Sequence, residues 1–510
     1  MKKFLLFLLF FGTEQINAQT YVLIPDANFR SYLQNIIPAA MSGYSMDVTN
    51  TLVTTAIQTI GVGGYGVSNL SGVQYFTSLK SLNCGNSLTA LPAVPNSLQY
   101  LYCSNNTSLT SLPTLSNTSL ILLDCSSNSL INLPSLSGTL KTLWCNGNSL
   151  STLPSLPNSL QALQCSNNSL TNLPTLSDSL KNLQCNNNSI ISLPALPSFS
   201  FKYLSCYNNS LTSLPPLPGS LLQLYCYKNS LTVLPALPNS LQTLDCRYNS
   251  LTSLPTMVYT SITSLNCSFN SLTSLPSLPN SLVDLVCWHN SLTSLPTLPN
   301  NISILECQNN SLTALPAFPN TLYNLMCDSN SIVSLPTLPL YSLQYLSCAH
   351  NSLTSLPSLP NSLHRLWCND NLIKCFPTFP VALWEPKLSN NPYTCLPNYI
   401  LPYMNNYTTT PICSSSNLNA CPDATVGLNE LNENDTQINI FPIPADGQLT
   451  IETKYKEKLI NLFDLNGKFL FSQNLEDKNK VDISSFSPGI YILTIKSGVK
   501  VVNKKLVIVR

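Results

Sequence analysis

The spacing of apolar residues along this chain repeats about every 20 positions. One copy, which starts at Leu160, reads LQALQCSNNSLTNLPTLSDS and follows the frame L-x-x-L-x-C-x-x-N-x-L-x-x-L-P-x-L-P-N-x. Its first half ends in apolar–polar–apolar alternation, which predicts a short strand with one buried face. Its second half carries proline at fixed places, so it should run as extended, polyproline-like backbone. We expect the copies to stack as a right-handed solenoid with a parallel sheet on its concave face, an arc of about 75 Å.

Almost every copy contains one cysteine, and successive cysteines are 19 to 22 residues apart. They are Cys84, Cys103, Cys125, Cys145, Cys165, Cys185, Cys206, Cys226, Cys246, Cys267, Cys287, Cys307, Cys327, Cys348 and Cys368. A sixteenth, altered copy follows. The pattern over residues 78–397 resembles leucine-rich repeats, and its LPxLP half resembles the short subtype of bacterial surface and effector proteins. The resemblance implies a mainly β fold, with about 16 copies of 20–22 residues.

The repeated cysteine and asparagine both have a structural interpretation. In-register parallel strands hold neighbouring cysteines about 4.8 Å apart, whereas a disulfide needs Cβ atoms nearer 3.8 Å. The sixteenth copy has Leu388 at the cysteine position, as expected of a packing site. We therefore predict a buried, reduced column from Cys84 to Cys368. The asparagine three residues later, from Asn128 to Asn391, should satisfy backbone groups of its own and the neighbouring coil.

Both ends of a solenoid need a cap, because a terminal coil exposes its core. Residues 19–77 should hold a helical cap and a degenerate first repeat, with Asp26 as a helix N-cap. The apolar face of this helix is predicted to comprise Phe29, Tyr32, Leu33, Ile36 and Ile37. Residues 398–427 form a C-terminal cap and linker, and disulfides are favoured there over zinc. Four cysteines allow three pairings, of which we favour Cys375 with Cys395 and Cys413 with Cys421.

The two ends of the chain predict export. Residues 1–18 have the basic start, short apolar run and final Ala18 of a signal peptide. From residue 428 to 510, strand-like runs alternate with turns such as Asn466-Gly467, which predicts a small antiparallel β-sandwich. FPIPADGQLTI, LFDLNGK, SPGIYILTI and the final strand with Lys504 and Lys505 resemble the sorting domain of type IX secretion substrates, although Ile443 replaces the usual Asn. The resemblance implies outer-membrane passage, then release or surface anchoring; an adhesive β-domain is the alternative.

Composition argues against most kinds of chemistry. Only 9% of residues are charged and the net charge is +1, which excludes a strong electrostatic footprint for nucleic acid. No later apolar stretch is long enough for a membrane span. Cys287 with His289 and Cys348 with His350 resemble metal half-sites, but they lie three coils apart, and the histidines are better explained as exposed turn residues. No hydrolase or phosphate-binding motif is present, so neither enzyme activity nor a cofactor or metal is predicted.

Aromatic residues with an occasional arginine mark the candidate binding surface on the concave face. The middle coils contribute Tyr203, Tyr207, Tyr225, Tyr227, Arg247, Tyr248, Phe269, Trp288 and His289, of which Tyr203, Tyr225, Tyr227, Arg247, Tyr248 and Trp288 are the main candidates. Smaller sets are Tyr100, Tyr102 and Trp144, and His364, Arg365 and Trp367. Cross-strand pairing of aromatics is an equally good explanation.

These patterns favour a non-enzymatic binding protein that recognises a protein or glycan ligand outside, or on the outer surface of, a Gram-negative bacterium. A structural surface or matrix scaffold without a ligand is the alternative. A ubiquitin-ligase effector is nearly excluded, because no cysteine follows residue 421.

Overall fold

The computed structural model describes residues 20–413 apart from 86, 117 and 401. It also describes residues 438–508 apart from 443–444, 454–457, 465–468, 476–479 and 498–499. The chain divides into two compact units, Met1–Ala424 and Thr425–Arg510. The expected signal peptide, Cys421, Ile443 and the Asn466-Gly467 turn lie outside the described residues. Within the part of the chain that is described, no helix is both long and apolar enough to cross a membrane.

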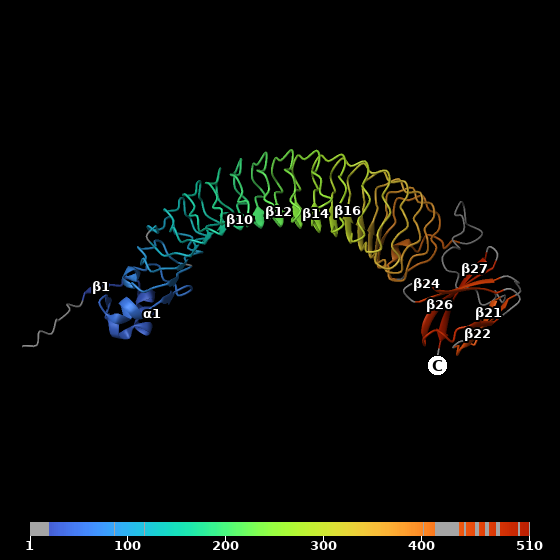
Figure 1. Ribbon diagram of the computed structural model, residues 1–510, viewed down its shortest axis with the longest axis horizontal. Helices are drawn as coiled ribbons and strands as arrows, with labels where there is room; N and C mark the ends of the chain where they lie inside the picture. Colours follow the sequence, from blue (N-terminus) through green and yellow to red (C-terminus); the bar gives the residue numbers. More distant parts are fainter. Residues whose placement is uncertain are drawn as a thin grey trace, which may run out of the picture. The chain divides into compact units, whose positions relative to one another are not determined.

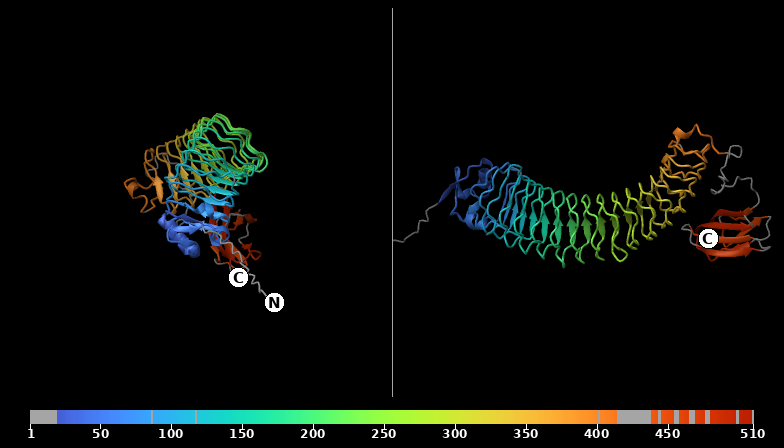
Figure 2. Two further views of the ribbon diagram at one scale, coloured as in Figure 1. Left: turned by 90° about the vertical axis from the view of Figure 1, so that its left-hand side faces the viewer. Right: turned by 90° about the horizontal axis from the view of Figure 1, so that it is seen from above.

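The first unit is the predicted solenoid, and its strands lie along the inner side of an arc (Figures 1 and 2). Each coil contributes one three-residue strand, and each strand pairs in parallel with the next, so that Leu285 is in register with Leu305. The last strand has Pro386 at its centre. Proline has no backbone N–H to donate to a neighbouring strand, which only a strand at the edge of a sheet tolerates. The strands of this sheet are β4 (Thr59–Gly61), β5 (Ser81–Asn83), β6 (Tyr100–Tyr102), β7 (Leu122–Asp124), β8 (Thr142–Trp144), β9 (Ala162–Gln164), β10 (Asn182–Gln184), β11 (Tyr203–Ser205), β12 (Gln223–Tyr225), β13 (Thr243–Asp245), β14 (Ser264–Asn266), β15 (Asp284–Val286), β16 (Ile304–Glu306), β17 (Asn324–Met326), β18 (Tyr345–Ser347), β19 (Arg365–Trp367) and β20 (Glu385–Lys387).

The core of the solenoid is a stack of equivalent leucines and cysteines. In the coil of β15, Leu282, Leu285, Cys287 and Leu292 are all fully buried. From β5 to β19 a cysteine follows the last strand residue, and its N–H continues the inter-coil hydrogen bonding: Cys287 N donates to Glu306 O at 2.8 Å. All fifteen cysteines from Cys84 to Cys368 are buried and unpaired, as predicted. The column is therefore part of the packed interior.

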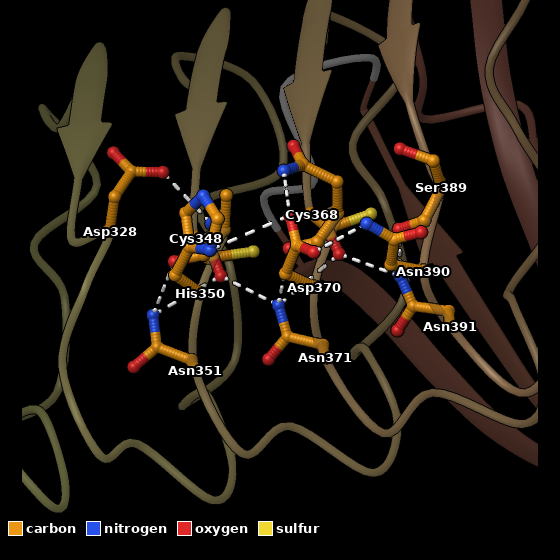
Figure 3. Close-up of polar contacts among 12 residues, drawn as sticks. Asp328, Cys348, His350, Asn351, Cys368, Asp370, Asn371, Ser389, Asn390 and Asn391 are labelled. Carbon is orange, nitrogen blue, oxygen red and sulfur yellow. Dashed lines mark hydrogen bonds and ion pairs between the residues drawn. The ribbon is translucent and has the colours of Figure 1, made fainter.

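The asparagine ladder is also confirmed. Asn371 Nδ2 donates to the carbonyl oxygens of Cys348 at 2.9 Å and Cys368 at 3.2 Å, and its Oδ1 accepts from Leu353 N at 2.9 Å. Figure 3 shows Asn351, Asn371 and Asn391 repeating this arrangement in successive coils. Each side chain thus closes the turn after its own strand and ties it to the preceding coil, which satisfies backbone groups that would otherwise be buried without partners.

The N-terminal cap contains the expected helix and a small sheet that was not predicted. Helix α1 (Ala27–Ile36) begins after Asp26, whose Oδ1 accepts from Phe29 N at 2.9 Å. Phe29, Leu33 and Ile37 are fully buried, while Tyr32 and Ile36 are partly buried against the same core. Strand β3 (Ser45–Asp47) pairs antiparallel with β1 (Tyr21–Leu23) and β2 (Met41–Ser42). Short helical turns occur at η1 (Pro38–Ala40), η2 (Leu52–Ala56) and η3 (Val73–Tyr75).

The pairing of cysteines favoured for the C-terminal cap is wrong. Cys395 is bonded to Cys413, with 4.9 Å between the Cα atoms, and Cys375 is also disulfide-bonded. The chain turns through η4 (Asn405–Tyr407) and comes back beside the last coil, where Leu396 N donates to Pro411 O and Cys413 N donates to Leu396 O. This return brings Cys413 to Cys395. Cys375 and Cys395 instead occupy equivalent positions of adjacent coils, where the repeat spacing suits packing better than a disulfide.

The second unit consists of two small antiparallel sheets around one core, as predicted. One sheet has the order β21 (Ile438–Phe441), β22 (Gln448–Thr453), β25 (Lys480–Asp482). The other has the order β24 (Phe469–Leu475), β23 (Lys458–Phe463), β26 (Gly489–Ser497), β27 (Lys500–Ile508). Leu449 and Val481 from the first sheet and Ile460, Leu493 and Leu506 from the second are buried in the shared core.

Candidate binding surface

The candidate residues of the middle coils lie in two adjoining places. Tyr203 and Tyr225 belong to β11 and β12 and lie on the sheet, with ring centroids 5.7 Å apart. The others follow the buried cysteine by one or two residues, beyond the end of the strand. We call this second group the aromatic rim: Tyr207, Tyr227, Arg247, Tyr248, Phe269, Trp288 and His289.

The backbone conformation of the turn makes the large side chains at one rim position unusual. The second residue after the ladder cysteine has a positive φ in coil after coil, from Asn105 at 59° to Asn390 at 55°. Most coils place Asn, Ser, Asp or Gly there, and Asn, Asp and Gly tolerate this left-handed conformation best. Four successive coils instead have larger side chains there, and so does one later coil: Lys228, Tyr248, Phe269 and His289, at 53°, 53°, 50° and 49°, and His350 at 53°. A left-handed residue with a bulky side chain costs about 1–2 kcal/mol. These coils thus accept local strain to present large side chains, a feature that clusters at functional sites.

The rim side chains form two continuous stacks along the solenoid. In the first, the rings of Tyr207 and Tyr227 are parallel with centroids 4.2 Å apart, and the Arg247 guanidinium covers Tyr227 at 4.6 Å. In the second, Phe269 lies between Tyr248 at 4.0 Å and His289 at 4.4 Å. The Trp288 ring meets Phe269 edge-on at 4.6 Å. Because each ring is held by its neighbours, the rim is a pre-ordered surface, and little entropy would be lost on binding.

Electrostatics within the rim keep its groups in defined charge states. Arg247 Nε lies 3.3 Å from Asp245 Oδ2, which supplies a counter-charge beneath the stack. Burial raises the pKa of Asp245, although Arg247 partly offsets this shift. Burial and the neighbouring Tyr207 raise the pKa of Tyr227 to about 12, so its phenol stays neutral at ordinary pH. The rim can therefore offer ring faces and hydrogen-bonding hydroxyls.

A polar hollow of about 250 Å³ adjoins the end of the first stack. It spans the coils of Cys145 to Cys206 and contains none of the sequence-predicted residues except Tyr203 and Tyr207. Its other lining residues are Asn146, Gln164, Ser166, Asn167, Gln184, Asn186 and Ser205. All of them occupy the frame positions one before or one to two after the cysteine, so comparing equivalent positions coil by coil would have found them.

A second cluster lies on β18–β20. It includes Arg365 and Trp367 of the late candidate set, which was predicted from the sequence as His364, Arg365 and Trp367. The Arg365 guanidinium lies over the rings of Tyr345, Trp367 and Trp384 at 5.3, 4.9 and 5.5 Å. Its Nε also pairs with Glu385 Oε2 at 2.7 Å. His364 instead contacts Gln344 at 3.1 Å. The cluster thus uses its cation and rings to pack on itself. Tyr345 and Trp384 were missed because the sequence does not show which rings of neighbouring coils lie around one arginine.

The early set is not brought together. Tyr102 and Trp144 lie two strands apart in one row of the sheet, with Asp124 between them. Tyr100 lies in another row, opposite Leu122.

The histidines do not form the half-sites that their spacing resembles. His289 stacks on Phe269, and His350 Nδ1 lies 3.5 Å from Asp370 Oδ2 (Figure 3). Cys287 and Cys348 are buried behind them, and burial raises the pKa of both thiols. Among the described residues, no three His, Cys, Asp or Glu side chains are grouped so as to hold a metal ion.

Comparisons with known proteins found one matching family model and several similar solved structures. Residues 439–509 match the secretion system C-terminal sorting domain. The chain is similar to the structure of YopM from Yersinia enterocolitica WA-314, at 32% identity over 68% of this chain and 86% of that one, with a TM-score of 0.58. It is also similar to YopM, a leucine-rich effector protein from Yersinia pestis, at 38% identity over 57% of this chain and 84% of that one, with a TM-score of 0.52.

A third similar structure is the functional domain of InlJ from Listeria monocytogenes, which includes a cysteine ladder. It is 20% identical, covers 96% of this chain and 99% of that one, and has a TM-score of 0.53, so the likeness concerns the fold alone. No curated protein matches the chain. The C-terminal unit is a type IX sorting domain and indicates secretion to the cell surface or the extracellular space of a bacterium.

Proposed function

The chain belongs to the leucine-rich-repeat proteins, and from that premise we propose that it is a non-enzymatic binding protein exported by a Gram-negative bacterium. It recognises a protein or glycan through the concave sheet and the aromatic rim. The main contact residues are those expected from the sequence: Tyr203, Tyr225, Tyr227, Arg247, Tyr248 and Trp288.

One observation carries this proposal: the rim presents the rings of Tyr248 and Phe269 from a strained backbone position. Cross-strand aromatic pairing could explain Tyr203 and Tyr225, which lie within the sheet. It does not explain Tyr248 and Phe269, which follow the strands and have φ values of 53° and 50°. Asparagine at that position would make the turn with less strain, as it does at Asn208 and Asn309. Rings and arginine are also the side chains that dominate binding hot spots.

A triple variant tests the proposal. Tyr225, Tyr227 and Trp288 are replaced by alanine, and wild type and variant are applied to glycan and protein arrays. The control replaces Phe199, Tyr259 and Tyr341, which are 90%, 81% and 73% exposed and lie in the turns that precede the strands. We expect the rim variant to lose the wild-type signal while the control keeps it.

Two results would count against a binding role for the rim. Retention of the array signal by the rim variant would mean that the rim is not the site. No array signal from the wild type, together with self-association in sedimentation that the control variant loses, would favour the alternative of a surface or matrix scaffold.

A further inference from the structure

The polar hollow beside the aromatic rim differs in chemistry from the rest of the sheet face. None of its lining residues is charged, and all but the two tyrosines are amides or hydroxyls. By contrast, the sheet further along carries Asp245, Asp284 and Glu306. A ligand of the hollow must therefore be held by neutral hydrogen bonds and ring contacts.

The floor of the hollow is pre-arranged by hydrogen bonds. Asn186 is 6% exposed, and its Oδ1 accepts from Ser166 Oγ at 2.7 Å and from Ser205 Oγ at 3.1 Å. The Asn186 Nδ2 group has no hydrogen-bond partner within the described part of the chain, so a donor remains available there. The Gln164 and Gln184 side chains, on β9 and β10, are likewise unengaged by any described residue and are half-buried. Amides of this kind both donate and accept.

On one side, the hollow is lined by Tyr207, the last ring of the first rim stack. Arg247 covers one face of Tyr227, and Tyr207 covers the other at 4.2 Å. Beyond Tyr207, the next coil has Asn186 at the equivalent position, so the stack ends and the hollow begins there. Tyr207 therefore presents the side of its ring that Tyr227 leaves uncovered.

We infer that this hollow binds a neutral glycan: one or two sugar rings of a longer chain, packed against Tyr207 and hydrogen-bonded to Asn186, Gln164 and Gln184. This inference rests on the proposed binding function and narrows it. A sugar ring has apolar C–H faces for the tyrosine and hydroxyls that match groups able both to donate and to accept. A volume of about 250 Å³ lies below the roughly 300 Å³ at which sites for whole drug-sized ligands begin, which fits part of a chain. Protein interfaces are depleted in serine and built around apolar cores, which the hollow lacks.

The test uses the mature full-length chain and a panel of neutral hexasaccharides: cellohexaose, laminarihexaose, xylohexaose, maltohexaose and chitohexaose. Calorimetry measures their binding, and a glycan array extends the panel to branched and anionic glycans. We expect at least one neutral glycan to bind, and its affinity to change little between about 50 and about 500 mM NaCl, because no charged group is involved.

Paired variants locate the site. Tyr207→Ala should weaken binding at least tenfold, whereas Tyr207→Phe should stay within about threefold, because the ring remains. Gln164→Ala combined with Gln184→Ala should weaken binding at least tenfold. Gln223→Ala, a strand glutamine outside the hollow, should leave the affinity unchanged. Trp288→Ala, at the far end of the rim, is measured beside Tyr207→Ala to show which end of the rim the glycan contacts. Circular dichroism of each variant verifies that the solenoid is folded.

The outcomes separate the inference from the function on which it rests. Binding of a protein but of no neutral glycan overturns the inference and leaves the binding role intact. The same holds if only anionic glycans bind, or if Trp288→Ala abolishes glycan binding and Tyr207→Ala does not. Absence of any ligand overturns both.

Discussion

Replacement of one ladder asparagine tests whether the ladder contributes to stability as its geometry indicates. Asn249 Nδ2 donates to Cys226 O at 3.1 Å and to Cys246 O at 3.0 Å, and its Oδ1 accepts from Leu231 N at 3.0 Å. The Asn249→Ala variant loses these three bonds, together with a longer one from Nδ2 to Arg247 O at 3.3 Å. A net contribution of about 1 kcal/mol for each of the three shorter bonds gives a loss of about 3 kcal/mol in the free energy of unfolding.

The assay combines urea unfolding, followed by circular dichroism, with hydrogen exchange. Repeat arrays often unfold in more than one step, so the local readout at Leu231 is decisive. We expect faster exchange of the amides in the coils of Cys226 and Cys246, and no change in coils further away, because each coil contacts only its neighbours.

Asn239→Ala is the matched control. Asn239 lies in the exposed turn one coil earlier, and its side chain has no hydrogen-bond partner among the described residues. This variant should stay within about 0.5 kcal/mol of wild type, as surface substitutions usually do. A loss below about 1 kcal/mol in Asn249→Ala, or equal losses in the two variants, would refute the reasoning, because it would mean that water replaces the ladder bonds.

Three further predictions concern the cysteines and the N-terminal cap. At about pH 8 a disulfide reagent such as DTNB should modify none of the ladder thiols without denaturant. Burial raises their pKa, that of Cys145 to about 12, so the reactive thiolate is absent. Modification of many of these thiols in the native protein would contradict a buried, reduced cysteine column. Replacing Cys395 and Cys413 by serine, 18 residues apart, should cost up to about 3 kcal/mol and increase hydrogen exchange in the C-terminal cap alone; unchanged exchange there would contradict a stabilising role for the bond. Burial acts to raise the pKa of Asp26, but hydrogen bonds from Phe29, Ser68 and Asn69 outweigh it and lower the pKa. The difference in unfolding free energy between wild type and Asp26→Asn should therefore be constant above about pH 5 and shrink as the pH falls through the lowered pKa. A difference that grows on acidification would show that the pKa of Asp26 is not lowered in the folded state.

Local and repeated features were predictable because the same physical requirement recurs in each coil. The period-2 alternation of Leu285 and Cys287 predicted a buried face, and the regular prolines excluded helix. Leu388 at a cysteine position indicated packing rather than chemistry. The asparagine ladder followed from the need to satisfy buried backbone groups where each strand ends. Asp26 and the apolar face beyond it predicted the capping helix, because its contacts are three and four residues apart.

Features that depend on how separate coils or distant segments meet were decided only by the tertiary structure. The bond between Cys395 and Cys413 exists because the chain after η4 comes back beside the last coil, a path that no spacing in the sequence reveals. The rim residues could be named from the sequence, but not their left-handed backbone or their stacking, which depend on the turn geometry and the register between coils. The polar hollow has neutral groups from four successive coils, each unremarkable by itself. Only the stacking of those coils brings them around one space.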